Sequence, residues 1–286
     1  WSGEGLIYVA CKVVIDCTDT GVVALRAGEN MIRGRESDGK VQVASWVFEV
    51  DGIDFKKLFD YFVCFPDDLR PFELDDADGH IRDILSQQAF VTGAFGRLVS
   101  KAEQDGMKLP RNNMPGVMFP EAAKFVTVAS RVEDVDPLNV KAYSKAESEG
   151  ASQAGVWIEF LRKYVPGFKH CDLSCTYGMI GVRETNHLIG EYILAANDLL
   201  SGRVFEDSIA LGGYHLAIHS PDHGGIETRK PLVYTIPYRS LLPMKTDNLL
   251  VAGRAISATH EAQSSTRVIP IGMAEGDFHT VTFAEA

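Results

Sequence analysis

The pattern of apolar and polar positions near the N-terminus predicts a strand, a tight turn and a short helix. Residues 12–15 form a run rich in β-branched side chains, and the polar residues 16–21 follow and end at a glycine. Residues 22–27 are apolar enough for a helix, which Gly28 would end. Short runs with glycine at their boundaries are typical of a compact strand–turn–helix unit.

Further strands are predicted along the chain. Residues 41–55 alternate between apolar and polar side chains, residues 124–137 look like a strand that runs into a turn, and residues 249–252 form the last clear apolar run. The segment "RNNMPGVMFP", residues 111–120, reads as a loop because proline interrupts it twice.

Helical spacing recurs between these strands. Ile81, Leu85, Ala89 and Phe90 share one helical face, and residues 137–165 give a long helical pattern that a Pro-Gly pair closes. A short helix is also expected over residues 197–213, with Gly212 and Gly213 at its end. Because strands and helices are interleaved, the pattern predicts an α/β or α+β fold rather than an all-α or all-β one.

The last predicted strand ends in residues that suit a ligand. Gly253 permits a positive φ or a close approach of the backbone to a bound group, and several donors follow it, Arg254, Ser257, Thr259, His260 and Arg267. In open α/β sheets, ligands bind outside the carboxyl ends of strands. An ordinary turn between a core strand and a helix, with surface polar residues, explains the same spacing.

Three other polar segments are candidates for a site. The first, "GVRETNHLIGEY", has Arg183, Glu184 and His187 in close succession, which would hold a carboxylate or a flavin edge, or would form a solvated ion-pair face. Arg183 and His187 share a face only if the segment is helical.

The other two segments follow it. The loop "AIHSPDHGG" carries His219, Asp222 and His223, which suit general acid–base chemistry and, with weaker support, a metal. The stretch "YTIPYRSL" places Arg239 beside two tyrosines, a combination that suits a planar or anionic group. An edge strand that ends at proline would have the same sequence.

Composition and charge argue against nucleic-acid binding and against membrane association. The chain has 286 residues, enough for one large domain or two small ones, and its net charge is −11, which disfavours a nucleic-acid or anionic-membrane surface. No apolar run reaches the ~18 residues that span a bilayer, and no secretory leader pattern occurs. We therefore expect a cytoplasmic protein that has no membrane span and does not bind nucleic acid.

Known short motifs are missing from the sequence. The five cysteines are scattered, and none has clear zinc spacing, so no metal site is expected. The chain contains no Walker A loop, no Gly-x-Ser-x-Gly elbow, no His-Glu-x-x-His and no Gly-x-Gly-x-x-Gly. Pattern and composition alone thus lead to an α/β protein with a candidate pocket near its C-terminus.

Four stretches together resemble the FAD-dependent oxidoreductase family of the glutathione-reductase-like superfold. They are "KVVIDCTDTGVVALRAG", "IGVRETNHLIGEYIL", "YTIPYRSLLP" and "DNLLVAGRAISATHEAQSSTRVIPIGMAEG". The last resembles the family's C-terminal flavin-contact segment over almost thirty residues, and the first resembles its internal "IDATGDGD…A…AG" motif. The four cover most of the chain in order and spacing.

This resemblance implies an α/β fold with an α+β insert. Residues 1–40 and 246–286 would form a partial Rossmann-like FAD-binding half, and residues 41–245 a larger substrate or cap region. The strand at 13–15 and the strand at 249–251 would pack side by side. The expected cofactor is FAD, and the expected activity is hydride transfer between a small organic substrate and the flavin.

The resemblance also implies roles for individual residues. Cofactor contacts are expected at Asp16, Thr18, Gly21, Gly253, Arg254, Ser257 and Gly272. Catalytic or substrate-side roles are expected at Arg183, His219, Arg239, His260 and Arg267. Donors and positive charge near the flavin would stabilise the anion that develops as hydride arrives.

Departures from the family pattern give the alternative. The phosphate-binding Gly-x-Gly-x-x-Gly module is expected upstream of Trp1. Asp19 and Thr20 stand where the family usually has glycine and aspartate. Residues 276–280 read "GDFHT" where the family usually has "GQAAG". We expect a truncated or split enzyme, completed by an N-terminal partner chain or by a homo-oligomer. Alternatively, the chain is a non-catalytic remnant or subunit that binds a partner or small molecule without flavin.

Overall fold

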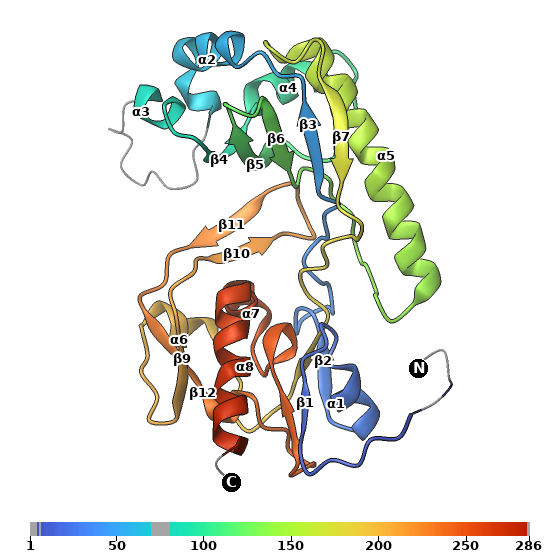
Figure 1. Ribbon diagram of the computed structural model, residues 1–286, viewed down its shortest axis with the longest axis vertical. Helices are drawn as coiled ribbons and strands as arrows, with labels where there is room; N and C mark the ends of the chain where they lie inside the picture. The colour runs from blue at the N-terminus through green and yellow to red at the C-terminus, as the bar shows by residue number, and fades with distance from the viewer. Residues whose placement is uncertain (1–4, 6, 70–80, 285–286) are drawn as a thin grey trace. The chain divides into compact units, whose positions relative to one another are not determined.

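The computed structural model describes residue 5, residues 7–69 and residues 81–284, and it divides the chain into two compact units. The first unit comprises Trp1–Gln42, Arg183–Ile218 and Ile226–Ala286, and the second comprises Val43–Val182 and His219–Gly225. Strands and helices occur in both units, which confirms the predicted α/β class (Figure 1).

The first unit is built from small sheets and helices. Its strands are β1 (Val14–Asp16), β2 (Met31–Arg33), β8 (Asn186–Leu188), β9 (Ser208–Gly212), β10 (Leu216–His219, whose last residue falls in the second unit), β11 (Ile226–Arg229), β12 (Tyr234–Pro237) and β13 (Leu249–Val251). Its helices are α1 (Val22–Ala27), α6 (Ala196–Leu200), α7 (His260–Thr266) and α8 (Ile269–Ala284), with 3-10 turns η2 (Tyr238–Ser240) and η3 (Gly253–Ala255).

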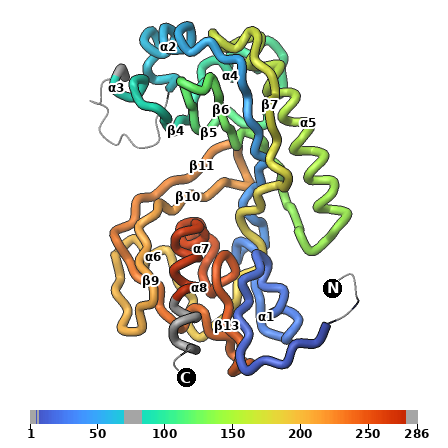
Figure 2. The backbone as a smooth tube through the Cα atoms, viewed as in Figure 1, coloured from blue at the N-terminus to red at the C-terminus, as the bar shows by residue number. Residues whose placement is uncertain are grey.

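Strands β1 and β13 pair in parallel, although they lie near opposite ends of the sequence (Figure 2). The register joins Val14 to Leu249 and Asp16 to Val251, so the predicted neighbours 13–15 and 249–251 are confirmed. The predicted turn and short helix are confirmed as well, because α1 begins at Val22 and Gly28 ends it with φ +88°.

The first unit also takes in segments that the sequence assigned to the cap region. Strand β8 pairs antiparallel with β2, and β9 pairs with β12. A buried cluster that includes Leu199, Tyr234 and Ile256 joins these segments to the C-terminal part of the chain. The unit is therefore larger than residues 1–40 and 246–286 alone, because non-local pairing, which the local pattern does not reveal, adds residues 183–218 and 226–245.

The second unit contains an antiparallel sheet in the order β4-β5-β6-β3-β7. Its strands are β3 (Phe48–Asp51), β4 (Phe90–Ala94), β5 (Met114–Phe119), β6 (Lys124–Thr127) and β7 (Asp172–Thr176). Its helices are α2 (Phe55–Cys64), α3 (Ile81–Leu85), α4 (Gly96–Gln104) and α5 (Val140–Tyr164), with the 3-10 turn η1 (Pro66–Asp68). The predicted long helix over 137–165 is confirmed by α5.

Two local predictions in this unit were wrong. The segment expected as a loop contains β5, in which Pro115 lies opposite Gly93 near the end of the strand and its carbonyl accepts from Thr127 Oγ1 at 2.8 Å. Phe90 was expected on a helix but begins strand β4. In both cases sheet pairing with neighbours far along the chain outweighs the local pattern.

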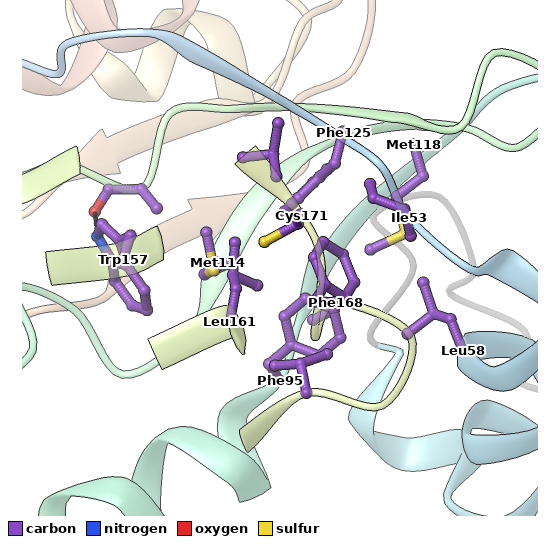
Figure 3. Close-up of a cluster of buried hydrophobic side chains, with 14 of the residues drawn as sticks. Ile53, Leu58, Phe95, Met114, Met118, Phe125, Trp157, Leu161, Phe168 and Cys171 are labelled. Atoms are coloured by element: carbon purple, nitrogen blue, oxygen red, sulfur yellow. Dashed lines mark hydrogen bonds between the residues drawn. The ribbon is translucent and has the colours of Figure 1, made fainter. Parts of the chain in front are cut away.

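Aromatic and aliphatic side chains fill the core of the second unit (Figure 3). Trp157 and Leu161 of α5 are fully buried there, and Trp157 Nε1 donates to the Ala129 carbonyl at 3.1 Å. Phe95 packs between Phe62, which it stacks on, and Phe168, which it meets edge-on. The backbone at Phe95 has a φ of +72°.

We expect the substitution Leu161→Ala to lower the free energy of unfolding of the second unit by about 2–5 kcal/mol, because it leaves a cavity in a packed core. The same truncation at Leu173, which is 39% exposed on strand β7, should change it by less than about 0.5 kcal/mol. Urea unfolding followed by tryptophan fluorescence measures both, since Trp46 and Trp157 belong to this unit. Equal losses would contradict the described core.

Candidate functional site

The carboxylate of Asp16 holds the turn between β1 and α1. Its Oδ1 accepts from the Thr18 amide at 3.0 Å and from the Thr18 hydroxyl at 2.5 Å, and its Oδ2 accepts from the Ala24 amide at 2.9 Å. Thr18 Oγ1 accepts in turn from the Val22 amide. These two predicted cofactor contacts therefore shape the turn itself. Gly21 follows with φ +62°, and a Cβ there would meet Met31 at 2.6 Å.

A cleft of about 440 Å³ lies at the carboxyl ends of β1 and β13. Its lining includes Cys17, Asp19, Gly253, Arg254, Arg267 and Gly272. The cleft thus brings together four of the predicted site residues, Gly253, Arg254, Arg267 and Gly272. A Cβ at Gly272 would lie 3.6 Å from the Gly253 Cα, so helix α8 approaches the strand end closely.

The two arginines that line the cleft, Arg254 and Arg267, differ in their partners and burial. Arg254 forms an ion pair with Asp19, whose side chain is 71% exposed. Arg267 is half-buried, its Nε has no hydrogen-bond partner among the described residues, and its Nη2 makes only a long contact with the Ala217 carbonyl. Burial lowers the pKa of Arg267 and the positive charge of Arg254 adds to the effect, whereas Tyr214 and Glu184 oppose it.

A buried carboxyl group lies behind this cleft. Glu275 on α8 is fully buried, and its Oε2 accepts from the Gly253 amide at 2.7 Å. Burial raises the pKa of Glu275 to about 8, although the hydrogen bond from Gly253 acts in the opposite direction. Burial of Glu275 therefore favours its neutral form, which reduces the negative charge beneath the cleft. Sequence reasoning missed Glu275, since an acid within an apolar helix has no local signature.

The most enclosed polar cluster centres on Glu184. Its Oε1 is 2.8 Å from His187 Nε2 and 2.8 Å from His260 Nδ1, and all three residues are buried. Both imidazoles therefore donate to one carboxylate oxygen. This contact places a proton on His260 Nδ1, so Nε2 is the nitrogen that does not contact Glu184. The interpretation of this segment as a solvated ion-pair face was wrong for Glu184 and His187, which are buried. The segment is not helical: Asn186–Leu188 form strand β8, and Arg183 and Glu184 precede it.

The protonation of this cluster follows from its contacts. Burial would raise the pKa of the Glu184 carboxyl, but the hydrogen bonds and charges of the two histidines outweigh burial and lower it. Burial would lower the pKa of His260, but its hydrogen bond and attraction to Glu184 outweigh burial and raise it. The cluster thus favours an ionised carboxylate beside an imidazole with increased proton affinity.

Two glutamines complete the support of Glu184. The Gln42 amide donates to Glu184 Oε2 at 2.8 Å, and the Gln42 side chain donates to Gln263 at 3.0 Å. Gln263 donates in turn to the Arg183 carbonyl at 2.9 Å. This chain fixes the carboxylate from three separate segments. Sequence reasoning missed both glutamines because they lie far from the motif and carry no charge.

The remaining predicted site residues lie apart from the cleft lining. Ser257 is buried and its Oγ accepts from the Gly190 amide at 3.1 Å. Arg239 pairs with Asp207, with Nε and Nη2 at 2.9 and 3.2 Å from the carboxylate oxygens. His219 is buried in the second unit, where its carbonyl accepts from the Val43 amide. Their predicted roles stay predictions.

Two kinds of feature are absent from the described residues, a metal-binding cluster and a membrane-spanning helix. They contain no group of three or more His, Cys, Asp or Glu side chains placed to hold a metal ion. Within the described part of the chain, no helix is both long and apolar enough to cross a membrane. The bulky positions expected in "GDFHT" include Phe278 and His279, whose side chains lie outside the described part.

Comparison with known proteins identifies the family. No curated protein and no solved structure matches the chain significantly. A family model described as FAD dependent oxidoreductase matches residues 1–281, which is nearly the whole sequence. The match agrees with the resemblance found in the four sequence stretches, and the chain therefore belongs to the FAD-dependent oxidoreductase family.

Proposed function

We propose that this chain binds FAD at the cleft beside Gly253 and transfers hydride between a small organic substrate and the flavin, with His260 as the acid–base residue. The observation that carries the proposal is the Glu184–His260 pair, which lies in the same unit as the cleft. Flavin chemistry removes a hydride from the substrate, so a proton must also leave, and a buried imidazole with a fixed second nitrogen suits that task.

The cleft residues fit part of a flavin dinucleotide. Gly253 leaves room for a flat ring to approach the backbone, because no atom lies within 4 Å of a Cβ built there, and the Arg267 Nε has no partner among the described residues. Arg254 and Arg267 would hold the phosphates or the electron-rich edge of the ring. When bound, the flavin supplies the two-electron acceptor for the substrate hydride.

The protein's own residues then have separate tasks. His260 Nε2 takes the proton that the substrate loses, and the resulting imidazolium is stabilised by Glu184 on the other nitrogen. Glu184 is a positioning residue, because it contacts the imidazole and not the substrate. Gln42 keeps the carboxylate oriented by donating its backbone amide.

One observation favours the second candidate function, a binding protein without flavin. The Asp19 carboxylate lines the cleft and pairs with Arg254, so it engages a cation that a phosphate would use. A phosphate entering there would have to displace this exposed ion pair, which is worth little in water. Retention of flavin decides between the two functions.

The first prediction concerns flavin binding. After incubation with excess FAD and desalting, the wild-type protein should keep a flavin absorbance spectrum. Arg267→Met should weaken FAD binding by about 10- to 100-fold, because it removes a charge-assisted contact worth about 1.5–3 kcal/mol. Arg229→Met changes an exposed arginine of the same unit outside the cleft lining and should bind as the wild type does. A colourless wild-type protein would support the second candidate function.

The second prediction concerns the proton affinity of His260. In Glu184→Gln, the pKa of His260 should fall relative to the wild type, as followed by its imidazole resonances in NMR titrations. Glu261→Gln is the matched control, because Glu261 also attracts His260 but makes no hydrogen bond to it and is only half-buried. Identical titrations in the wild type and Glu184→Gln would rule out the positioning role.

The third prediction concerns stability against pH. The pKa of His260 is raised on folding, so its contribution is complete below its ordinary value of 6.5 and is lost as the pH rises through the folded value. The pKa of Glu184 is lowered, so its contribution is complete above 4.5 and is lost as the pH falls. The difference in unfolding free energy between wild type and Glu184→Gln should therefore be largest between pH 4.5 and 6.5, measured by urea unfolding.

A further inference from the structure

The second unit contains a buried arginine that has no acidic partner in the described part of the chain. Arg111 is 2% exposed, and its Nε and Nη1 are buried with no hydrogen-bond partner among the described residues. Burial lowers the pKa of Arg111 to about 10, and the charge of Arg131 acts in the same direction. A guanidinium has five donors and no acceptor, so unpaired buried nitrogens are costly.

The topology explains why two arginines meet here. Arg111 precedes strand β5 and Arg131 follows strand β6, and these strands pair antiparallel. The start of the first and the end of the second therefore lie at the same end of the pair. Arg131 also has a buried Nε for which the described residues supply no partner, while its Nη1 pairs with Glu133, which is exposed.

A short loop packs on both arginines. Arg131 Nη2 donates to the carbonyl oxygens of Ser220 at 3.2 Å and Pro221 at 3.1 Å. Gly224 lies against the backbone of Arg111, because a Cβ added there would be 3.7 Å from the Arg111 Cα. The segment His219–Gly225 belongs to the same unit as both arginines. The loop therefore meets the two cations through backbone carbonyl groups and a glycine.

We propose that Arg111 and Arg131 form a binding site for an oxyanion, a carboxylate or phosphate group of a small molecule, beneath the loop 219–225. The Nε and Nη1 atoms of Arg111 both carry N–H donors without a partner among the described residues, and charged N–H donors bind carboxylate and phosphate oxygens strongly. The unpaired Nε of Arg131 offers a third donor.

The site is closed in this structure, so the loop must move to admit the anion. Gly224 and Gly225 give the loop the backbone freedom for that movement. Binding would neutralise a charge that otherwise remains desolvated and unpaired, and this gain offsets the cost of moving the loop. The inference does not depend on the proposed flavin chemistry, because every residue in it belongs to the second unit.

The test is thermal unfolding of the full chain, followed by tryptophan fluorescence, in sodium phosphate or sodium malonate against sodium chloride at equal ionic strength. The wild-type midpoint should rise saturably by about 5–10 °C near a hundredfold excess over the dissociation constant. A rise with phosphate alone assigns a phosphoryl ligand, and a rise with malonate alone assigns a carboxylate.

Variants separate a site from a general salt effect. Arg111→Met should be at least as stable as the wild type in chloride, because it removes an unpaired buried charge, and should lose the response to both anions. Arg111→Lys keeps the charge but places all its donors on a single nitrogen and should respond weakly, which tests the site even if the Met variant fails to fold. Arg97→Met, at an exposed arginine above the Phe65 ring, should respond as the wild type does. An equal response in Arg111→Lys and wild type, or none in wild type beyond chloride, would overturn the proposal.

Discussion

The parallel pairing of β1 with β13 is the constraint on which the candidate site depends. It joins the turn that follows Asp16 to the glycine turn that follows Val251, and the Ala252 amide donates to the Asp16 carbonyl at 3.0 Å just beyond the pairing. Without this pairing, Asp19 and Arg254 would not meet, and the cleft would lose one wall. A few backbone hydrogen bonds between distant segments thus determine where a ligand can approach.

The two polar centres of the first unit, the cleft beside Gly253 and the cluster around Glu184, differ in the surroundings of their charged groups. At the cleft, cations meet solvent, an exposed carboxylate and a neutral buried acid, so their charge remains available to a ligand. Around Glu184, the charge is enclosed and almost every donor has an acceptor. The first arrangement suits binding, and the second suits holding one proton in a fixed geometry.

Local pattern was enough to predict the elements that the chain forms by itself. The strand–turn–helix at the N-terminus, the long helix α5 and the last strand were predicted because their periodicity and glycine boundaries are local. Strand β5 was missed because it exists only through pairing with β4 and β6. The family was also recognisable from sequence, whereas the expected partner chain and Rossmann-like half stay predictions.

The site was predictable to a smaller degree. Arg254, Arg267 and the glycines near them follow one strand, so a sequence motif could point to them. The role of Glu184 depends on its hydrogen bonds with His260 and Gln42, which lie on other segments and could not be paired with it from the sequence. The burial of Arg111 could not be predicted from the sequence, since an arginine in a polar loop is normally expected to be exposed.

The backbone at Phe95 shows that the core of the second unit stabilises an unfavourable turn conformation. A bulky residue with a positive φ carries a strain of about 1–3 kcal/mol. It persists here because the ring is held among Phe62, Phe125 and Phe168. If that aromatic packing loosened, the turn between β4 and α4 would relax to an ordinary conformation and α4 would lose its starting position. Turn and core therefore melt as one cooperative step.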